Sequence, residues 1–327
     1  MPELPEVETV VRGLVQEGLA GLCITSVEVR WPRIFGRDPD RLRQALTGRC
    51  VRCVGRRAKY IVLDLDDGAR VLIHLRMTGK LRFADRQTPV GSHDHVILTL
   101  SDGRRLLYND TRKFGRFVLC DAATDPLTAL GPEPLEPGFT GPCLARQLAG
   151  HRRMIKPLLL DQTVIAGLGN IYVDEALWHA RIHPETPADR LTPRELARLH
   201  RAIRQVLSDA VKNRGTTLGN GASNFYSVAG RRGRHADRLQ VFRRDGLPCP
   251  RCRTMLARRV VAQRGTHYCP VCQPIVSAGN SSAPRRNTWL EVKHHERRNT
   301  NRSSSSGNGS RHSDRGLCRP AVHRPNG

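Results

Sequence analysis

The chain has 327 residues and a formal net charge of +24, from 54 Lys+Arg against 30 Asp+Glu. This length is enough for two hydrophobic cores, and we expect two domains. The charge suits a polyanion such as nucleic acid. It does not reside in the C-terminal end alone, because residues 273–327 carry ten Lys+Arg and three Asp+Glu and leave +17 for the rest.

No apolar run reaches the roughly 18 residues that a membrane-spanning helix needs. The N-terminus also lacks the basic and then apolar pattern of a signal peptide. We therefore expect a soluble cytoplasmic protein without a membrane partner.

The first elements in chain order are one helix and a series of strands. Apolar residues recur at helical spacing from Val7 to Val15, after Pro5, which suits a first turn, and before Gly21. From Cys23 to Cys120, short β-branched runs such as YIVLDL and HVILTL are separated by DDG and SDG turns. This pattern predicts an antiparallel sandwich or barrel.

The stretch LGPEPLEPGFTGP, from Leu130 to Pro142, is dense in Pro and Gly and marks the domain boundary. Beyond it the pattern becomes helical. In TPRELARLHRAIRQVLSDAVKNRG, Thr192 can cap a helix, Pro193 suits its first position and Glu195 completes a capping box. We interpret the apolar face of this helix as core.

Four cysteines have the spacing of a zinc ribbon. CPRC ends in Cys252, sixteen residues follow, and CPVC begins with Cys269. Two tight thiolate turns at this spacing predict a tetrahedral site for one structural zinc ion. Such a closed site folds its module and does no chemistry of its own. The predicted ligands are Cys249, Cys252, Cys269 and Cys272.

The other cysteines give no comparable signal. Cysteines of a cytoplasmic protein are expected to be reduced. CVRC, at Cys50 and Cys53, has the local metal spacing but no partner pair nearby, so we interpret it as two cysteines in a strand. The rest are assigned to packing or to the tail: Cys23, Cys120, Cys143 and Cys318.

Eight motifs in order across residues 1–273 resemble bacterial formamidopyrimidine-DNA glycosylase. They are MPELPEVET, RRAKY, HLRMTGKL, DTRKFGRF, IKPLLLDQ, GLGNIY, GTTL and AQRGTHYCPVCQ. The resemblance implies an α+β fold: an N-terminal antiparallel β-sandwich with an N-terminal helix, then a helix-two-turn-helix domain and a four-cysteine zinc finger. The expected ranges are a catalytic domain at 1–130, a linker at 131–150, the helical DNA-binding domain at 151–240, the zinc finger at 241–273 and a disordered basic tail at 274–327.

The implied activity is that of a monomeric, bifunctional base-excision repair enzyme. It would flip oxidised purines such as 8-oxoguanine out of damaged double-stranded DNA, cut the glycosidic bond and nick the strand. Removal of Met1 would free the secondary amine of Pro2, whose pKa of about 7.7–8.0 suits a nucleophile that forms an imine. Glu3 matches the general acid. Glu6 matches a second acid near the sugar, or is a first-turn acid of the helix.

Two basic residues complete the implied catalytic set. Lys59 in RRAKY matches a lysine that contacts phosphate and assists elimination. Arg264 matches a finger-tip arginine in the predicted hairpin RRVVAQRGTHY. The resemblance assigns this arginine both a grip on the flanking phosphates and a proton-donor role in δ-elimination. Because the pKa of arginine exceeds about 12, we favour the grip on phosphate over proton donation.

The resemblance also implies DNA contacts. An expelled base leaves a space, which Met77, Arg112 and Phe114 would fill. Asn170 follows GLG where a helix begins, so its side chain and the neighbouring amides could hold a phosphate. Further candidate phosphate contacts are His74, His93 and Arg152.

The segment GNGASNFYSVAGRRGRHADRLQVF, at 219–242, is longer and more basic than the usual loop that encloses the flipped base, which leaves the lesion preference open. Two rival functions remain at this stage. An endonuclease VIII-like glycosylase would prefer oxidised pyrimidines. A zinc-ribbon DNA-binding protein without enzymatic activity would not need Pro2 or Glu3.

Overall fold

The computed structural model describes residues 1–275, apart from 37, 121–124 and 220–223. The predicted disordered tail lies outside the described residues except for its first two positions. Among the described residues, no helix is both long and apolar enough to cross a membrane.

The N-terminal strands form two four-stranded antiparallel sheets, as the sequence predicts. One sheet has the order β1-β6-β7-β5 and the other the order β2-β3-β4-β8. Their apolar faces share one core, so the architecture is a sandwich. Strand bounds in the first sheet are β1 Ile24–Val29, β6 Asp94–Leu100, β7 Arg105–Asn109 and β5 Lys80–Ala84; in the second they are β2 Val51–Arg57, β3 Tyr60–Leu65, β4 Arg70–His74 and β8 Arg116–Cys120.

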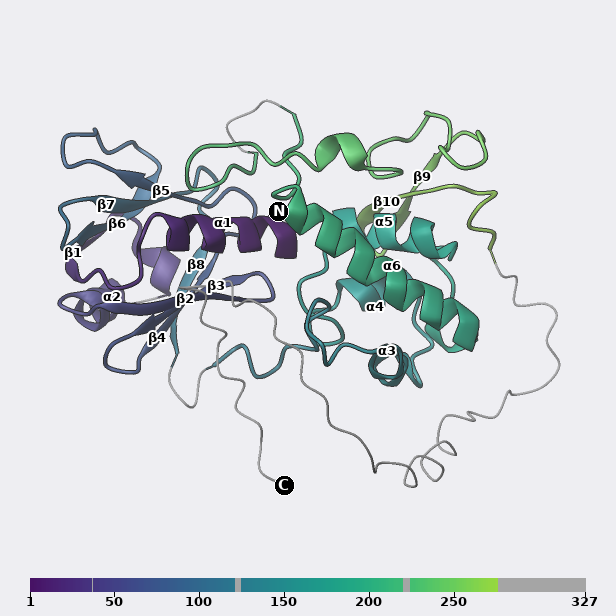
Figure 1. Cartoon of the computed structure of the whole chain (residues 1–327), viewed down its shortest axis with the longest axis horizontal. Helices are drawn as coiled ribbons and strands as arrows, with labels where there is room; N and C mark the ends of the chain where they lie inside the picture. Colours follow the sequence, from purple (N-terminus) through teal and green to yellow (C-terminus); the bar gives the residue numbers. More distant parts are fainter. Residues whose placement is uncertain (37, 121–124, 220–223, 276–327) are drawn as a thin grey trace, which may run out of the picture. The chain divides into compact units, whose positions relative to one another are not determined.

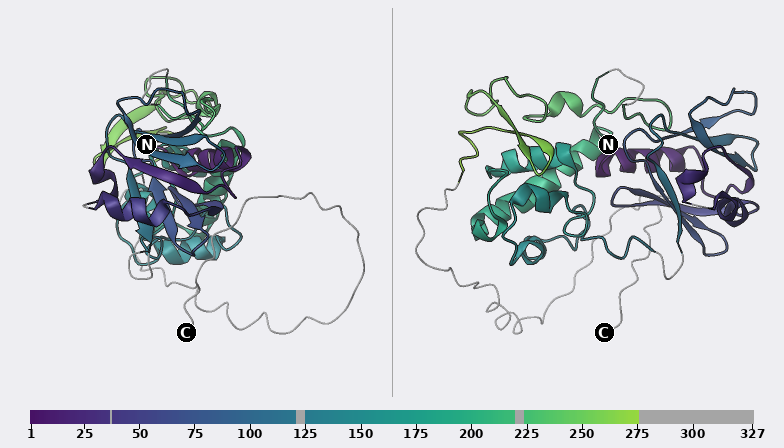
Figure 2. Two further views of the ribbon diagram at one scale, coloured as in Figure 1. Left: turned by 90° about the vertical axis from the view of Figure 1, so that its left-hand side faces the viewer. Right: turned by 180° about the vertical axis from the view of Figure 1, so that it is seen from behind.

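Helix α1 (Leu4–Gln16) packs its apolar stripe into this core. It runs along the strands in both the front and the back view (Figures 1 and 2). A short 3-10 turn η1 (Pro32–Phe35) and helix α2 (Pro39–Leu46) connect β1 to β2. The buried position of α1 fixes the start of the chain, which would otherwise fray.

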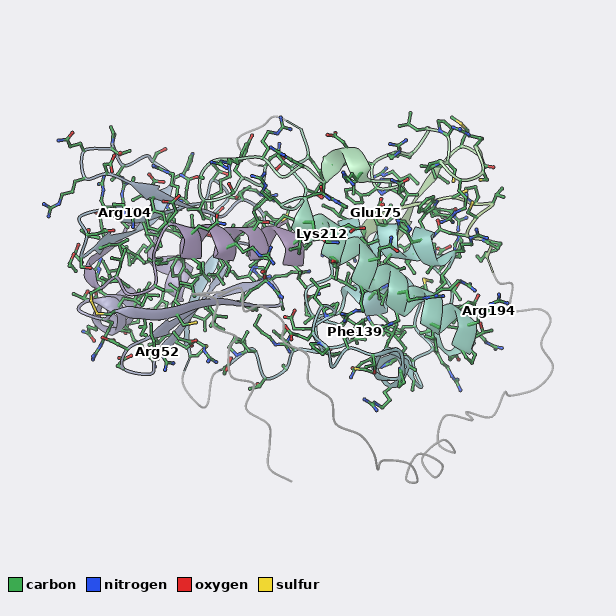
Figure 3. All side chains as sticks on the ribbon, in the orientation of Figure 1. Arg52, Arg104, Phe139, Glu175, Arg194 and Lys212 are labelled. Carbon is green, nitrogen blue, oxygen red and sulfur yellow. A yellow bond between two sulfur atoms is a disulfide. The ribbon has the colours of Figure 1, made fainter. Side chains whose placement is uncertain are left out.

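The second core is helical. Helix α6 (Pro193–Lys212) begins at the predicted Thr192 cap, and both hydrogen bonds of the Thr192–Glu195 capping box are present. The core includes Phe139, labelled in Figure 3, and the inner faces of the other helical elements of this domain. The remaining helices are α3 Gly141–Leu148, α4 Ile155–Leu160 and α5 Asn170–Ala180, with 3-10 turns η2 Ala188–Arg190 and η3 Ala236–Arg238.

A two-stranded hairpin, β9 (Ala257–Val261) and β10 (Arg264–Tyr268), follows the helices. Its two-residue turn, Ala262 and Gln263, has positive φ at both positions, the geometry of a type I′ turn. Arg264 therefore stands at the tip of the hairpin, as the sequence predicts.

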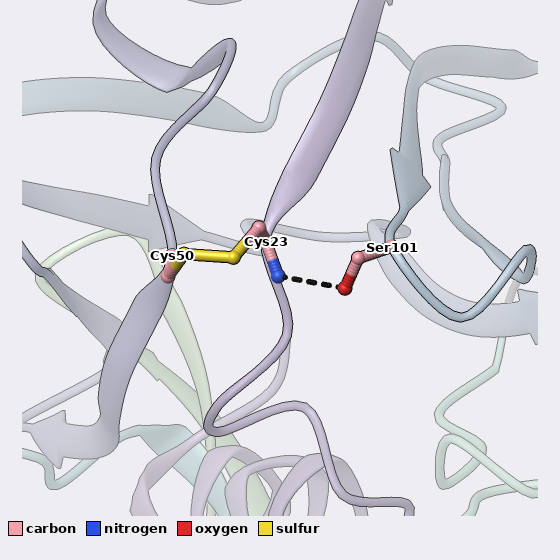
Figure 4. Close-up of a disulfide and its surroundings, with 3 residues drawn as sticks. All are labelled: Cys23, Cys50 and Ser101. Carbon is pink, nitrogen blue, oxygen red and sulfur yellow. Dashed lines mark hydrogen bonds between the residues drawn. A yellow bond between two sulfur atoms is a disulfide. The ribbon is translucent and has the colours of Figure 1, made fainter.

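One prediction about the cysteines is wrong. Cys23 and Cys50 form a disulfide (Figure 4), whereas we expected reduced cysteines with Cys23 in a packing role. The two residues face each other in an isolated antiparallel bridge between the chain that enters β1 and the chain that enters β2. Backbone bonds from Ile24 to Arg49 and from Val51 to Leu22 flank the pair, and such non-hydrogen-bonded positions bring opposite side chains closest. Cys53 lies buried in β2 and takes no part in this disulfide, as its expected place in a strand implies.

Candidate active site and nucleic-acid interface

The start of α1 meets the start of α5. The N–H of Leu4 donates to the carbonyl of Gly167 at 3.1 Å. The buried carboxylate of Glu3 accepts the N–H groups of Ile171 at 2.9 Å and Tyr172 at 3.4 Å, the free amides at the N-terminus of α5. Glu3 thus caps a helix 168 residues away in the chain.

This arrangement corrects one expectation for Asn170. We expected the amides beside it to hold a phosphate, but Glu3 already occupies those of Ile171 and Tyr172. The Asn170 side chain itself donates to the carbonyl of Gly265 at 2.9 Å. Its Oδ1 is buried and has no hydrogen-bond partner, and because this oxygen can only accept, a contact with a phosphate would use the second N–H of Nδ2.

Glycines make this approach feasible. A Cβ on Gly169 would lie 2.3 Å from the carboxyl carbon of Glu3, and one on Gly167 would lie 2.6 Å from Leu4. Gly215, with a φ of +74°, lies against Glu6 in the same way, since its Cβ would lie 2.7 Å from the Glu6 Oε1. The GLG and GTT motifs therefore have a steric role: they let the two buried acids sit against the backbone.

Glu6 lies in the first turn of α1 but faces inward. Its carboxylate accepts the N–H of Glu3 at 2.8 Å, the hydroxyl of Tyr172 at 2.5 Å and the N–H of Thr216 at 2.7 Å. Burial, helped by the charge of Glu3, raises the pKa of Glu6 to about 7. Burial likewise raises the pKa of Glu3, although Lys59 and the α5 amides oppose the rise. Two neighbouring carboxyls therefore hold protons more readily than free ones do.

Lys59 enters the site from the two-residue turn between β2 and β3. Its Nζ donates to the carbonyl of Leu168 at 2.6 Å, and only 5% of the residue is exposed. Burial lowers the pKa of Lys59, with smaller contributions from Arg264 and Arg76, while Glu3 and Glu6 raise it. The hydrogen bond from Asn170, the first residue of α5, to the carbonyl of Gly265 holds the hairpin tip beside the same site.

The turn that carries Lys59 is held by Glu133. The carboxylate of Glu133 accepts the N–H of Ala58, whose φ is +52°, and pairs with Arg56 at 2.9 Å and Arg57 at 3.1 Å. Arg56 also pairs with Glu8 of α1 at 2.9 Å. This ion-pair network fixes the position of the turn from which Lys59 reaches the start of α5.

Pro2 is buried beside these groups. The terminal amine of Met1, one residue earlier, has its pKa lowered mainly by burial, and Lys59 and Arg243 also lower it, while Glu3 and Glu6 raise it. The start of the chain, two buried acids and a buried lysine therefore share one small volume.

His74 lies at the end of β4, and its pKa is lowered to about 3 by burial and by the charges of Arg76 and Lys59. Its Nδ1 accepts the N–H of Arg76 at 3.0 Å. A neutral His74 can still donate one hydrogen bond from Nε2 to a phosphate oxygen. His93 and Arg152 are exposed, His93 before β6 and Arg152 in the loop before α4.

The three residues predicted to fill the vacated space project outward. Met77 and Phe114 are 40% and 47% exposed, which is unusual for large apolar side chains. The guanidinium of Arg112 lies 4.7 Å from the centre of the Phe114 ring. Two neighbouring loops thus present an apolar plug, a wedge and a hydrogen-bond donor together.

The four predicted zinc ligands converge. The Sγ atoms of Cys249, Cys252, Cys269 and Cys272 all lie within 4.8 Å of one another. The pairs Cys249–Cys272 and Cys252–Cys269 are 4.0 Å and 3.4 Å apart, close to the roughly 3.8 Å edge of a tetrahedron with Zn–S bonds of about 2.3 Å. The four thiolates fit one zinc ion, and the group is the only such cluster among the described residues.

Several buried polar residues of the site were not singled out from the sequence. Lys156, fully buried, donates to Asp174 at 2.6 Å and to the carbonyl of Gly265 at 3.1 Å. Asp174 also accepts the N–H of His267 at 2.9 Å. These bonds connect the hairpin to α4 and α5. The sequence signal for these buried residues was the presence of charged residues inside the otherwise apolar helical motifs IKPLLL and NIYVDEAL.

Glu175, labelled in Figure 3, also holds two segments of the chain together. Its carboxylate accepts the consecutive N–H groups of Gln240, Val241 and Phe242 at 2.9–3.1 Å. Burial raises the pKa of Glu175, while these amide bonds lower it. The residue holds the segment that leads from the helices to the zinc module.

Comparisons with known proteins agree with this geometry. Family models match residues 1–117 (formamidopyrimidine-DNA glycosylase N-terminal domain), 130–220 (formamidopyrimidine-DNA glycosylase H2TH domain) and 246–275 (zinc finger found in FPG and IleRS). The formamidopyrimidine-DNA glycosylase of Chloroflexus aurantiacus is 48% identical over 278 residues, covering 84% of this chain and 98% of that protein. The one from Protochlamydia amoebophila is 42% identical over 274 residues, covering 84% and 99%.

Solved structures show the same fold. The complex between the Lactococcus lactis Fpg and an abasic site containing DNA superposes with a TM-score of 0.77 at 38% identity, covering 84% of this chain and 100% of that one. A complex of the same protein with a Fapy-dG containing DNA gives a TM-score of 0.76 at 38% identity, with the same coverage.

The protein combines a sandwich, a helix-two-turn-helix domain and a four-cysteine finger, and buried carboxyl groups lie at the start of its chain. These features define a zinc-finger DNA glycosylase of base-excision repair. Within that class, the chain belongs to the formamidopyrimidine-DNA glycosylase family, because its relatives match over nearly their whole length at well above 30% identity. The predicted fold class and the predicted structural zinc site are thereby confirmed.

Proposed function

We propose that this protein excises oxidised purines, 8-oxoguanine and formamidopyrimidines, from duplex DNA and then nicks the strand. The observation that carries the proposal is the meeting of the chain start, Glu3, Glu6 and Lys59 at the N-terminus of α5. The names of the relatives and the damaged DNA in the Lactococcus lactis complexes support the substrate class.

Removal of Met1 would convert the Pro2 nitrogen into a free secondary amine. The burial that lowers the pKa of the Met1 amine acts at the same place, so we expect the pKa of the freed Pro2 amine to be lowered as well, which favours its neutral form. The nitrogen lone pair attacks C1′ of the sugar. The glycosidic bond breaks as its electron pair leaves with the base, and the base takes up the proton that the Pro2 nitrogen loses on bonding to C1′.

Glu3 acts as the general acid. Its raised pKa makes the carboxyl hold a proton more readily than a free carboxyl does, and in the protonated form it gives that proton to O4′ as the C1′–O4′ bond opens. The product is a cationic imine between Pro2 and C1′. Loss of a proton from C2′ then expels the 3′ phosphate, loss of a proton from C4′ expels the 5′ phosphate, and water hydrolyses the imine.

The basic residues act on the phosphates. In this proposal Lys59 holds the phosphate beside the reacting sugar, and Arg264 at the hairpin tip clamps the flanking one. Further proposed contacts come from His74, His93, Arg152 and Asn170. Met77, Arg112 and Phe114 would occupy the space of the expelled base. A structural zinc ion would hold the hairpin but would take no part in bond breaking.

We further infer that the protein acts as a cytoplasmic monomer. One chain supplies every residue of the proposed site, so no second subunit is needed. The zinc site needs four thiolates, which suits a reducing compartment, whereas the Cys23–Cys50 disulfide points the other way.

The deciding experiment traps the imine. Full-length protein, shown by intact mass to lack Met1, is incubated with an 8-oxoguanine:cytosine duplex and sodium borohydride, and peptide mapping locates the adduct. An adduct on Pro2 supports the proposal. No adduct from such protein would refute the enzymatic mechanism, and faster excision of thymine glycol would replace only the substrate, in favour of an endonuclease VIII-like specificity.

A further inference from the structure

Two loops carry the three exposed residues that are proposed to fill the space of the expelled base. Residues 75–79 connect β4 to β5 and carry Met77. Residues 110–115 connect β7 to β8 and carry Arg112 and Phe114. Each loop crosses from one sheet of the sandwich to the other, because β4 and β8 belong to one sheet and β5 and β7 to the other.

A single buried carboxylate joins these loops. Asp110, 1% exposed, accepts the hydroxyl of Thr78 and the N–H of Arg112 on Oδ1, the latter at 3.2 Å. Its Oδ2 accepts the N–H of Gly115 at 2.8 Å and the hydroxyl of Tyr108 at 3.3 Å. The hydroxyl of Thr78 also accepts the N–H of Arg112 at 3.2 Å. Thr78 and Asp110 therefore form a direct side-chain link between the loops.

The packing around this link leaves no slack. A Cβ on Gly79 would lie 2.3 Å from the hydroxyl oxygen of Tyr108, and a Cβ on Gly115 would lie 1.6 Å from it. Tyr108 is itself buried and meets Phe117 edge-on, with ring centres 5.1 Å apart. Both loops are thus pressed against one fixed hydroxyl group.

We propose that the Thr78–Asp110 pair, supported by Tyr108, is a latch that holds the Met77 loop and the Arg112–Phe114 loop at one separation. Thr78 and Asp110 are positioning residues, since the contacts with DNA are made by the side chains that they hold. The inference rests on the proposed function and adds residues that determine how the base is expelled.

The physical reason is preorganisation. Expelling a base costs a few kcal/mol of stacking and pairing, and the inserted side chains must recover that amount. Loops that moved independently would also lose conformational freedom on insertion, which weakens the gain. A fully hydrogen-bonded buried carboxylate avoids this loss, because the loops are already ordered in the free protein.

The test compares Thr78→Val, which removes the hydroxyl, with Thr78→Ser, which keeps it. Three readouts are measured with the full chain: single-turnover excision of 8-oxoguanine opposite cytosine, cleavage at a preformed abasic site, and stopped-flow fluorescence of 2-aminopurine beside an 8-oxoguanine analogue whose glycosidic bond cannot be cut. The last reports insertion without any bond breaking.

We expect Thr78→Val to slow excision and the insertion phase about tenfold or more while abasic-site cleavage stays within about threefold, because an abasic site has no base to expel. Thr78→Ser should keep all three rates within about threefold of wild type. Equal loss of excision and abasic-site cleavage in Thr78→Val, or equal defects in Val and Ser, would overturn the latch.

Asp110→Asn and Asp94→Asn form a matched pair of controls for folding. Asp94 is a similarly buried carboxylate of the same sandwich, bonded to Arg82, Gly91 and Asn109 but to neither loop. Both variants should lose stability, and only Asp110→Asn should change the ratio of excision to abasic-site cleavage. The same change in both would assign the effect to stability and overturn the latch. An inactive wild-type enzyme would instead refute the proposed function, while the insertion fluorescence would still judge the latch.

Discussion

Glu3 and Ile171 are joined by a hydrogen bond of 2.9 Å from the N–H of Ile171 to the carboxylate of Glu3. This bond places the side chain that directly precedes α1 on the N-terminus of α5. One carboxyl group therefore connects the two cores of the protein, and it is also the group proposed to protonate the sugar. The acid is held by backbone donors on one side and faces the chain start on the other.

Glu3→Gln should abolish excision while the site stays assembled. The amide oxygen of glutamine can still accept the N–H of Ile171, the shorter of the two bonds to α5, but the amide cannot donate the proton. We expect excision of 8-oxoguanine to fall by about 100-fold or more, in line with typical general-acid contributions. Single-turnover kinetics measure the effect. Glu17→Gln, at the exposed far end of α1, is the matched control and should leave the rate unchanged.

Glu6 should make stability depend on pH. Its pKa is about 7 in the folded protein against 4.5 for an ordinary carboxyl, so the folded state binds the proton more tightly. Stability from this group is full below pH 4.5 and is lost as the pH rises to 7, by at most about 3 kcal/mol. Denaturant unfolding of wild type and Glu6→Gln should give a difference that shrinks by this amount over that range. A constant difference would contradict the raised pKa.

Gly169→Ala should damage the site through a steric clash. The added methyl group would lie 2.3 Å from the Glu3 carboxyl carbon, so either Glu3 or the start of α5 must move. We expect a loss of about 1–3 kcal/mol in stability and at least about a tenfold loss of excision, as small misplacements of catalytic groups produce. Gly138→Ala, whose Cβ would meet nothing within 4 Å, is the control. Wild-type activity in Gly169→Ala would show that the close approach is dispensable.

Removing zinc should weaken DNA binding without unfolding the sandwich. Cys269→Ser takes away one of four thiolates, and structural zinc sites fold their modules only with the full ligand set. Elemental analysis should give one zinc ion per wild-type chain and much less for the variant. DNA affinity should fall because Arg264 lies on the hairpin next to this site. Cys120→Ser should retain both zinc and affinity.

Reducing the Cys23–Cys50 disulfide should lower thermal stability. The bond spans 27 residues, and the chain-entropy account assigns such a loop about 3–4 kcal/mol. Melting temperatures with and without dithiothreitol measure the effect, and the double variant Cys23→Ser, Cys50→Ser should not respond to dithiothreitol. Intact mass under non-reducing conditions checks that the bond is present. Equal melting temperatures would show that it contributes nothing.

Local features of the sequence determined much of this protein. The alternating β-branched runs predicted antiparallel strands, Thr192 and Glu195 predicted the start of α6, and the CxxC pairs predicted the zinc site. Each of these rests on residues only a few positions apart, or on a ligand spacing that a small module must satisfy by itself. Local chemistry is sufficient for such features.

Family resemblance in the motifs singled out Glu3, Glu6 and Lys59, yet it did not show what holds them. Glu3 accepts hydrogen bonds from α5, and Glu6 accepts them from Tyr172 and Thr216. Lys59 donates to the carbonyl of Leu168. Those partners come from distant parts of the chain, and no periodicity along the sequence relates them.

The sequence likewise did not predict that Cys23 pairs with Cys50 or that Thr78 pairs with Asp110. Each pair meets because the sandwich brings two strands, or two loops, opposite each other. The sequence alone therefore determined the elements and the zinc ligands, and it named the residues proposed to react. Only the tertiary structure decided which buried polar groups pair, because that depends on register and packing between segments far apart in the chain.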